Sequence, residues 1–518
     1  MGSRKKGIFV AAAAYLLLLV ILLCSERTDP NAVIRSFGDA LWYSLVTLTT
    51  VGYGDLYPVT AAGRIVGLLF LCGSLGLLAA VAAAVFSLLR VRIGPWLRLL
   101  RLRGKTVYLF SEENEASSAL GRQLAEQNPD AHIVFCGATD SGVMGVEDNI
   151  HRWEAELPDF LRGDAGSLRM QGIFLMAEDA ERNRALAAEI GKAGCPVYCM
   201  TTEAGAPPGV RAFDPVKCVA RQFWRQYPAE KKEQVMLFIG DGPLARQMLE
   251  QTVQVNVRVP FARAEYHFFG AWDEYLRRHY ALNDVLFRAD APEQDRFLFH
   301  DRPWDADPDL IRRADRIVFC DDDPARNASE AAGLVRLFPF RGRADAYGGR
   351  MPEGVNAFGS AEEVFTPEMV MGMEQDLAAR GLHALYCREN GQHQAWEKLT
   401  EFQQESNRAA ADHLQTKLAL LLPEEEHPAL TPENVRAALE RFRQASPAER
   451  EKYRRCEHER WMRFHLLYNW HYDAGEKNEA LRTHPSLLPY EQLPEAERVK
   501  DDYAWQNLAI LEKGADVE

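Results

Sequence analysis

The 518-residue sequence has few cysteines, and they form no recognisable metal or disulfide motif. Nine cysteines are scattered along it, and only Cys195 and Cys199 lie close together. The sequence has neither a C-x-x-C pair nor a cluster of cysteine with histidine. A structural zinc site and a disulfide framework are therefore not expected, and a reducing cytosol is consistent with the pattern.

The sequence also lacks an excess of positive charge. Its formal net charge is −14 at pH 7, although arginines are dense between residues 90 and 105. The acidity therefore lies in the long part that follows residue 105. This distribution argues against nucleic acid as a partner.

Long uncharged stretches occur near the N-terminus, at residues 7–24 and 65–89. Each is long enough to cross a bilayer as a helix. A signal peptide is the alternative for the first stretch, but its alanines come first and no small-x-small cleavage site follows. Basic residues flank the pair, with Arg4, Lys5 and Lys6 before it and several arginines after it. The positive-inside rule then predicts a multi-pass protein of the cell inner membrane, with the N-terminus and the large C-terminal region in the cytoplasm.

Between these stretches lie an amphipathic segment, residues 35–48, and a glycine-rich loop. This loop, which we call the glycine loop, reads Thr-Thr-Val-Gly-Tyr-Gly-Asp over residues 49–55. A dehydrated cation needs rings of oxygen at short range, and a backbone supplies one carbonyl per residue if each can turn inward. Gly52 and Gly54 permit this, because glycine enters backbone regions forbidden to other residues. Thr50 can add a hydroxyl, and Tyr53 can brace the loop from behind.

The glycine loop therefore predicts a potassium-selective filter. Its expected residues are Thr50, Val51, Gly52, Tyr53, Gly54 and Asp55, with potassium ions bound at Thr50, Val51, Gly52 and Tyr53. One chain carries one loop, so a ring of carbonyls requires several copies. A Gly-Tyr-Gly turn without meaning is the alternative, and the two flanking apolar stretches argue against it.

The order helix, re-entrant helix, filter, helix over residues 1–104 resembles the two-transmembrane potassium channels. The resemblance implies a homotetramer. Gly73 and Gly76 fall in the middle of the second long helix, where they are candidate gating hinges or, equally, sites of close helix packing. No run of spaced arginines precedes the pore, so voltage sensing by a charged helix is not expected.

After residue 105, strand and helix patterns alternate, which predicts a doubly wound, Rossmann-like domain over residues 105–228. The expected strands are 106–110, 132–136, 172–176 and 196–200. The first strand-to-helix turn, residues 111–118, lacks a G-x-G-x-x-G pattern and carries three carboxylates. A pyrophosphate is accordingly disfavoured there.

A second Rossmann-like domain is expected over residues 229–366, with strands near 235–239, 265–269, 296–299 and 316–320. Its first turn has the pattern G-x-G-x-x-A, which suits a phosphate at a helix N-terminus. The candidate nucleotide-binding residues are Gly240, Asp241, Gly242 and Ala245. Asp241 places a negative charge in this loop, and the alternative is a tight turn without a ligand. Nothing in the domain suggests a catalytic acid or base, so we do not expect an enzyme.

Paired Rossmann-like domains after a two-helix pore resemble the regulator-of-potassium-conductance (RCK) domains, which implies a cytoplasmic gating ring. Residues 367–432 are expected to be helical, as 367–385 and 396–422, and to end in a linker at 423–432. Residues 446–450 then predict a capping-box helix start.

The region from 433 to 518 resembles the RyR domain, the repeat of ryanodine receptors. The motifs lie at residues 458–461, 469–472, 484–490, 493–495 and 500–501, with Asn469 where that family usually has glycine. A zinc-protease H-E-x-x-H is excluded, because Met462 stands where the second histidine belongs. Aromatic faces and basic groups suggest a ligand pocket, and the alternative is that the aromatics form the core of a small domain. The candidate residues are Arg460, Trp461, Arg463, Trp470, Tyr472 and His484.

The sequence thus predicts a multidomain protein with an α-helical two-transmembrane pore module, two α/β Rossmann-like domains and a mainly α C-terminal domain. The expected function is a ligand-gated potassium channel with a nucleotide or cyclic dinucleotide as effector and membrane lipid around it. Two alternatives remain: a membrane-anchored oxidoreductase or nucleotide hydrolase, and a non-conducting sensor or scaffold.

Overall fold

The computed structural model describes residues 2–88, 102–138, 149–163, 168–190, 193–202, 207, 209–288, 294–372, 376–425 and 427–512. The chain divides into two units, Met1–Arg103 and Gly104–Glu518. We describe each unit by itself.

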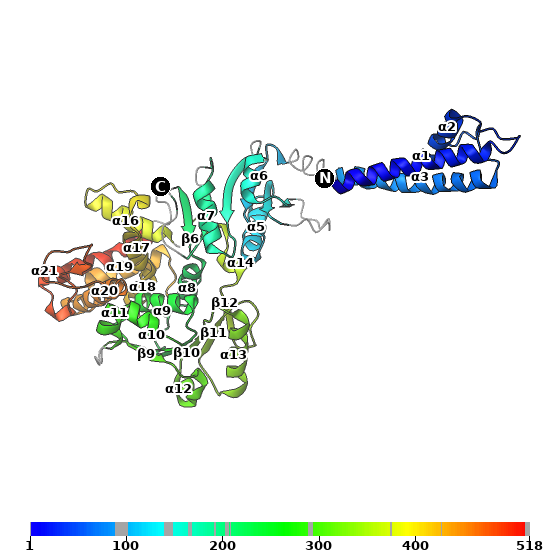
Figure 1. The fold of residues 1–518 in the computed structure, drawn as a ribbon. Helices are drawn as coiled ribbons and strands as arrows, with labels where there is room; N and C mark the ends of the chain where they lie inside the picture. The colour runs from blue at the N-terminus through cyan, green and yellow to red at the C-terminus, as the bar shows by residue number, and fades with distance from the viewer. Residues whose placement is uncertain are drawn as a thin grey trace. The chain divides into compact units, whose positions relative to one another are not determined.

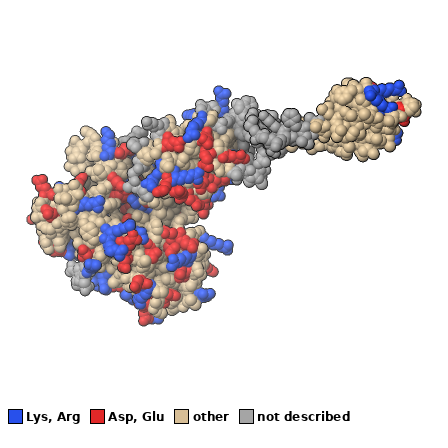
Figure 2. Space-filling view, viewed as in Figure 1, with Lys and Arg blue, Asp and Glu red and all other residues tan. Residues whose placement is uncertain are grey.

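The first unit contains three helices, α1 (Gly2–Glu26), α2 (Phe37–Leu48) and α3 (Ala61–Leu88). Figure 1 shows α1 and α3 running side by side, with α2 against one end of the pair. Their shared core includes Leu19, Leu22 and Phe70. Among the described residues, Ala61–Ala83 is long and apolar enough to cross a membrane, whereas the apolar helical stretch Ala13–Glu26 is shorter. On the face drawn in Figure 2, the charged side chains among the described residues of this unit lie at the end that holds α2.

The first α/β layer of the second unit is a six-stranded parallel sheet in the order β3-β2-β1-β4-β5-β6. Its elements are β1 (Thr106–Phe110), α5 (Glu115–Gln127), β2 (Ala131–Cys136), β3 (Ile150–Trp153), α6 (Leu157–Gly163), β4 (Arg169–Leu175), α7 (Ala180–Ile190), β5 (Val197–Met200), β6 (Val210–Phe213) and α8 (Pro215–Gln226). Buried apolar residues fill β1, β2 and β5, which explains their strand character. The strand order reverses between β1 and β4, as in doubly wound folds.

The second sheet has the same topology, in the order β12-β11-β10-β7-β8-β9. Its elements are β7 (Val235–Ile239), α9 (Pro243–Val255), β8 (Glu265–Phe269), α10 (Asp273–Arg278), α11 (Tyr280–Leu282), η3 (Asn283–Phe287), β9 (Arg296–His300), η4 (Trp304–Ala306), α12 (Pro308–Arg313), β10 (Arg316–Phe319), α13 (Pro324–Leu337), β11 (Arg343–Tyr347), β12 (Asn356–Phe358) and α14 (Ala361–Val364). The switch point lies between β7 and β10. The predicted fold class is therefore confirmed: a helical pore-like N-terminus precedes two parallel α/β sheets.

The remaining elements are α15 (Pro367–Val370), α16 (Leu377–Glu389), η6 (Trp396–Lys398), α17 (Glu401–Asp412), α18 (Leu414–Leu421), α19 (Pro432–Gln444), α20 (Pro447–Leu467), β13 (His471–Tyr472), β14 (Thr483–His484), η7 (Tyr490–Gln492), α21 (Glu495–Arg498), η8 (Val499–Asp501), α22 (Asp502–Gln506) and η9 (Asn507–Glu512). The capping box at Ser446 and Glu449 is present and starts α20. Each expected long helix, 367–385 and 396–422, was wrong as a single element. Within the range 396–422, helix α17 ends at Asp412 and a separate helix, α18, begins at Leu414.

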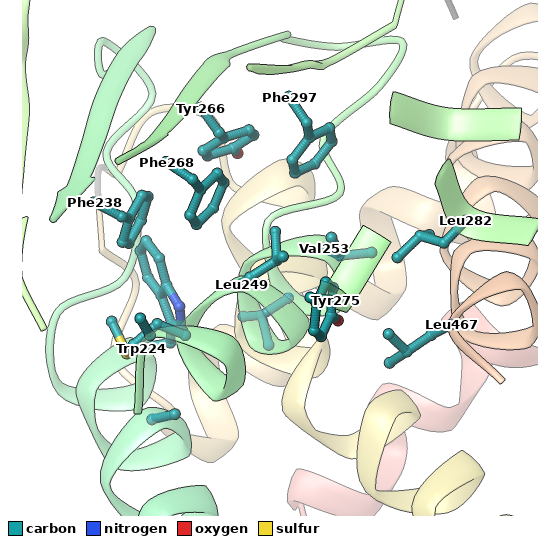
Figure 3. Close-up of a cluster of buried hydrophobic side chains, with 14 of the residues drawn as sticks. Trp224, Phe238, Leu249, Val253, Tyr266, Phe268, Tyr275, Leu282, Phe297 and Leu467 are labelled. Carbon is teal, nitrogen blue, oxygen red and sulfur yellow. The ribbon is translucent and has the colours of Figure 1, made fainter. Parts of the chain in front are cut away.

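The C-terminal half of helix α20 packs on the second α/β layer, whereas Tyr453 and Cys456 in its first half belong to a separate cluster with α18 and α19. Met462 and Leu467 of α20 belong to one cluster of buried side chains with Leu249 and Val253 of α9. Figure 3 shows this cluster, with Phe238, Phe268 and Phe297 from the strands on one side and Leu467 on the other. The C-terminal region thus shares part of its hydrophobic core with the second α/β layer.

Candidate functional site

The glycine loop adopts an alternating backbone conformation. Thr50, Gly52 and Gly54 have φ of 60°, 59° and 74°, so every second residue is left-handed. A positive φ is rare for a β-branched residue such as threonine, and strain of this kind concentrates at functional sites. Alternating handedness lets successive peptide groups face the same side.

Hydrogen bonds from the end of α2 support the start of this loop. The amides of Val51 and Gly52 both donate to the carbonyl oxygen of Val46, at 3.0 and 3.2 Å, and Thr50 N donates to Thr47 O at 3.1 Å. Helix α2 itself begins at a capping box formed by Ser36 and Asp39. The helix and the loop are therefore one connected unit.

Trp42 of α2 holds the other end of the glycine loop. Its ring stacks on Tyr53 with a centroid distance of 5.9 Å and an interplanar angle of 1°. Its indole Nε1 donates to Asp55 Oδ2 at 2.9 Å. The expected bracing role of Tyr53 thus has a partner, Trp42, that the sequence analysis did not single out.

A buried carboxylate joins the end of α1 to the start of α3. Glu26 is fully buried and accepts hydrogen bonds from Val59 N at 2.9 Å, Thr60 N at 3.1 Å and Thr60 Oγ1 at 2.7 Å. A Cβ at Gly63 would collide with its Oε1, so a larger residue there would have to displace the carboxylate. Glu26 therefore satisfies amides that precede α3 and have no helical acceptor.

Both hinge candidates lie inside the continuous helix α3. A Cβ at Gly73 would make ordinary contact with Leu48 Cδ2 at 3.5 Å, and a Cβ at Gly76 would meet no atom within 4 Å among the described residues. Tight packing within this chain therefore does not require glycine at either position.

The turn that contains Gly240, Asp241, Gly242 and Ala245 lies between β7 and α9, beside the switch point. Asp322, which follows β10, points its carboxylate at the start of α9 and accepts from Leu244 N at 3.0 Å. A Cβ at Gly242 would collide with this carboxylate. Burial raises the pKa of Asp322. The place where a phosphate would approach α9 therefore holds a carboxylate of the same chain.

Asp241 and Gly240 also make contacts within the domain. Asp241 Oδ2 accepts from Ala271 N at 2.6 Å. Gly240 has φ of 139° and lies against the backbone of Cys320 and Asp321, where a Cβ would come within 3 Å. Ala245 is buried in the core. Glycine at position 240 thus allows the ends of β7 and β10 to lie close together.

The corresponding turn of the first sheet is also held by side chains. Asn114 caps α5 and donates from its amide to Met176 O at 2.6 Å. Glu113 forms a bidentate ion pair with Arg152, and Glu112 pairs with Arg182 at 3.0 Å. Two of the three carboxylates noted in the sequence, Glu112 and Glu113, are therefore matched by arginines of the same layer.

The candidate residues of the C-terminal region fall into two groups. Arg460 is buried and pairs with Glu457 at 2.7 Å, and Arg463 is fully buried between Glu459 and Asp295, at 2.8 and 2.9 Å. Trp470 is buried and stacks on Phe402. These three side chains hold α20 in place.

Trp461, Tyr472 and His484 are more accessible. Tyr472 is 47% exposed, and Trp461 contacts His484 with a centroid distance of 4.9 Å. Burial lowers the pKa of His484, which favours its neutral form. In the described part of the chain, no group of three or more histidine, cysteine or carboxylate side chains could hold a metal ion.

The N-terminal unit matches known channels. Residues 8–91 match the family model described as ion channel. The chain is 45% identical over 69 residues to human potassium voltage-gated channel subfamily A member 6, which covers 12% of this chain and 13% of that protein. It is 54% identical over 43 residues to a voltage-gated potassium channel of Aeropyrum pernix, covering 8% and 15% of the two chains. The chain thus spans 13% to 15% of the length of these relatives.

Solved structures with similarity over a longer range include two of GsuK. The structure titled GsuK Channel is 13% identical with a TM-score of 0.36, covering 74% of this chain and 86% of that one. The structure of GsuK bound to ADP is 14% identical with a TM-score of 0.34, covering 71% and 99%. The family model thus covers residues 8–91, and the matches to curated potassium channels are 69 and 43 residues long.

Proposed function

We propose that the protein is a homotetrameric, potassium-selective channel of the cell inner membrane, controlled by a nucleotide that binds its cytoplasmic region. The observation that carries the conduction part is the alternation of positive φ at Thr50, Gly52 and Gly54. Carbonyl oxygens of residues 50–53 and the Thr50 hydroxyl would replace the hydration shell of the ion. The match of residues 8–91 to the ion channel family supports this role.

The exposed side chains of the N-terminal unit support an assembly of several copies. Val51 and Tyr53 are 53% and 68% exposed in the single chain, although a filter needs protein around its irregular backbone. Large apolar side chains also cover α3, among them Leu68, Leu71, Leu75 and Leu78, each at least 51% exposed. Four copies around one axis, surrounded by lipid, would cover both the side chains of the glycine loop and the apolar side chains of α3.

The nucleotide part rests on the soluble unit. Two doubly wound sheets place strand ends at switch points, where α/β proteins bind ligands. The Gly240–Gly242 turn offers the start of α9 to a phosphate if the Asp322 carboxylate moves away. The C-terminal region, which resembles the RyR domain, offers Trp461, Tyr472 and His484 as further contacts for a nucleotide or cyclic dinucleotide. Such a ligand controls the pore only if it prefers one conformation of the soluble unit.

The test is ion flux through the full-length protein in liposomes. We expect potassium flux well above sodium flux, and a change in that flux with at least one member of a panel of adenine nucleotides and cyclic dinucleotides. Gly52→Ala is the loss-of-selectivity variant, and Gly76→Ala is its matched control. Absent flux from a folded tetramer would favour the non-conducting sensor or scaffold instead.

A further inference from the structure

A cavity of about 940 Å³ lies among the helices of the second unit, and its described lining includes neither residues 111–118 nor the Gly240–Gly242 turn. Its walls come from α8, α16, α17, α18 and η9, whose helices lie close together in Figure 1. We call it the α8–α16 cavity. Its volume falls within the range of roughly 300–1,000 Å³ that is usual for small-molecule sites.

The charge of the lining favours an anion. Four arginines line the cavity, and Asp412 is the one acidic residue among its described lining. Arg221 pairs with both Asp412 at 2.8 Å and Asp376 at 2.9 Å, and Arg380 lies 3.7 Å from Glu397. Arg225 and Arg388 are exposed, so they form the solvent side of the lining. Guanidinium groups are suited to phosphate because they donate two parallel hydrogen bonds.

The inner wall of the cavity is apolar and aromatic. Leu414 and Trp396 are buried there, and Arg380 lies over the Trp396 ring at 5.6 Å. Trp224, which is 2% exposed, also lines the cavity, and its indole Nε1 has no hydrogen-bond partner among the described residues. A buried indole N–H usually has a hydrogen-bond acceptor. A ligand atom that accepts from Trp224 Nε1 would therefore supply the missing partner.

The first strand-to-helix turn of each sheet is occupied by a side chain of the protein. At α9 the Asp322 carboxylate occupies the approach, and at α5 the Asn114 side chain caps the helix. An anion entering either turn would first have to displace a side chain of the protein. The α8–α16 cavity needs no such displacement of a carboxylate.

We propose that the α8–α16 cavity binds the effector, and that the effector is an organic phosphate with a flat heterocyclic body, of the nucleotide class. The heterocycle enters between Trp396, Leu414 and Trp224, and the phosphates meet the arginines at the opening. This inference rests on the proposed function, because it names the site of the same effector.

The position of the cavity gives a route from the ligand to the first sheet. Arg221 of α8 bridges Asp376 at 2.9 Å and Asp412 at 2.8 Å, and Arg408 pairs with Asp376 at 2.6 Å. This buried network ties α8, which closes the first α/β layer, to α17. A ligand that contacts both α8 and α16 therefore stabilises one relative arrangement of these helices.

The experiment is calorimetric titration of the detergent-solubilised full-length protein with ADP, NAD and a cyclic di-adenine nucleotide. Inorganic phosphate, adenosine and oleate are separate arms. Two variants alter the cavity: Arg388→Glu reverses a charge at the opening, and Ala384→Phe fills the space. Arg443→Glu on α19, 67% exposed and not among the described cavity residues, is the matched control. Asp322→Asn tests the turn at α9.

We expect at least one nucleotide to bind and both cavity variants to weaken it by about tenfold or more. The control and Asp322→Asn should leave its affinity unchanged. Unchanged affinity in both cavity variants, binding altered only by Asp322→Asn, or binding of oleate without any nucleotide would each overturn the inference. Selective potassium flux together with nucleotide binding that both cavity variants leave unchanged would overturn this inference alone. Selective flux without any nucleotide binding would also overturn nucleotide control, and nucleotide binding without flux would overturn the proposed channel function.

Discussion

Gly52 and Gly54 are held at positive φ without any crowding. A Cβ on either would meet no atom within 4 Å among the described residues of the chain. A left-handed conformation costs a residue with a side chain about 1–2 kcal/mol. The requirement for glycine is therefore one of backbone torsion.

Gly52→Ala should abolish the preference for potassium over sodium, because the loop would relax toward negative φ and turn a carbonyl away. The soluble unit should unfold at the same temperature as before. Selectivity is measured by flux and folding by calorimetry. Gly76→Ala carries the same added methyl group on a helix and should keep selectivity; normal selectivity in Gly52→Ala would remove the filter assignment.

Glu26 should be the most sensitive single carboxylate of the N-terminal unit. Its loss leaves the amides of Val59 and Thr60 without an acceptor, and each buried unsatisfied group costs about 1–3 kcal/mol. Thermal unfolding of the tetramer should rank wild type above Glu26→Gln, and that variant above Glu26→Ala. Glu26→Gln keeps one acceptor oxygen. Equal stability of the wild type and the two variants would contradict the role of Glu26 as acceptor for these amides.

Glu250 should make the stability of the soluble unit depend on pH. Burial raises its pKa to about 7, opposed by the nearby Lys217 and by hydrogen bonds from Gln247 and Tyr275, whereas Glu405 adds to the rise. The folded protein therefore holds a proton that the unfolded chain releases near its ordinary pKa of about 4.3. Stability from this group is complete below that value and is lost as the pH rises through about 7.

Replacing Glu250 with glutamine should remove that dependence. The stability of Glu250→Gln relative to wild type should rise between pH 5 and pH 8, because each tenfold difference in proton affinity between the folded and unfolded states is worth about 1.4 kcal/mol. Denaturant unfolding at several pH values measures the difference. Glu362→Gln, on an exposed carboxylate of α14, is the control. A difference that is flat with pH would contradict the assignment.

At the scale of elements, helix α3 is apolar over a length that can cross a membrane, and it contains Gly73 and Gly76. Packing within the described chain does not require glycine at either position. Gly→Ala in a helix interior favours the helical conformation by about 1 kcal/mol. If bending of α3 opens the pore, Gly73→Ala or Gly76→Ala should lower the open probability in bilayer recordings without changing selectivity. Ala79→Gly, one turn further on, should not lower it. An unchanged open probability in both alanine variants would assign the glycines to packing.

The sequence predicts strands best where they are apolar and continuous. The bounds of β1, β7 and β8 were predicted to the residue, because five consecutive residues are of strand type and most are buried. Strands β3, β6, β11 and β12 were missed. In β11, for example, Asp345 is fully buried because Arg343 pairs with it, and neither residue type signals a strand.

The glycine loop could be recognised in the sequence because its residues are consecutive. The hydrogen bonds between residues far apart in the sequence could not be recognised in the same way. Glu26 and Thr60 are 34 positions apart, and Asp322 lies 78 positions from Leu244. Such pairs appear only when the chain is folded. The pairing of Arg460 with Glu457 was different, since an i, i+3 spacing on a helix already signals an ion pair.

At the scale of the whole molecule, the C-terminal region depends on the second sheet. Met462, Leu466 and Leu467 share a core with α9, and Arg463 pairs with Asp295, both fully buried. A fragment of residues 433–518 should therefore lack fixed tertiary structure, as judged by near-ultraviolet circular dichroism. The fragment 229–518, which keeps the second sheet, is the comparison. An independently folded short fragment would contradict the shared core.

The central claim is that four glycine loops together form a filter that passes potassium and excludes sodium. The most direct measurement is the reversal potential of the purified full-length protein in a planar bilayer, with potassium on one side and sodium on the other. We predict a reversal potential displaced strongly toward the potassium equilibrium, and lost in Gly52→Ala. A reversal potential near zero, or no conductance from a folded tetramer under any effector, would contradict the account.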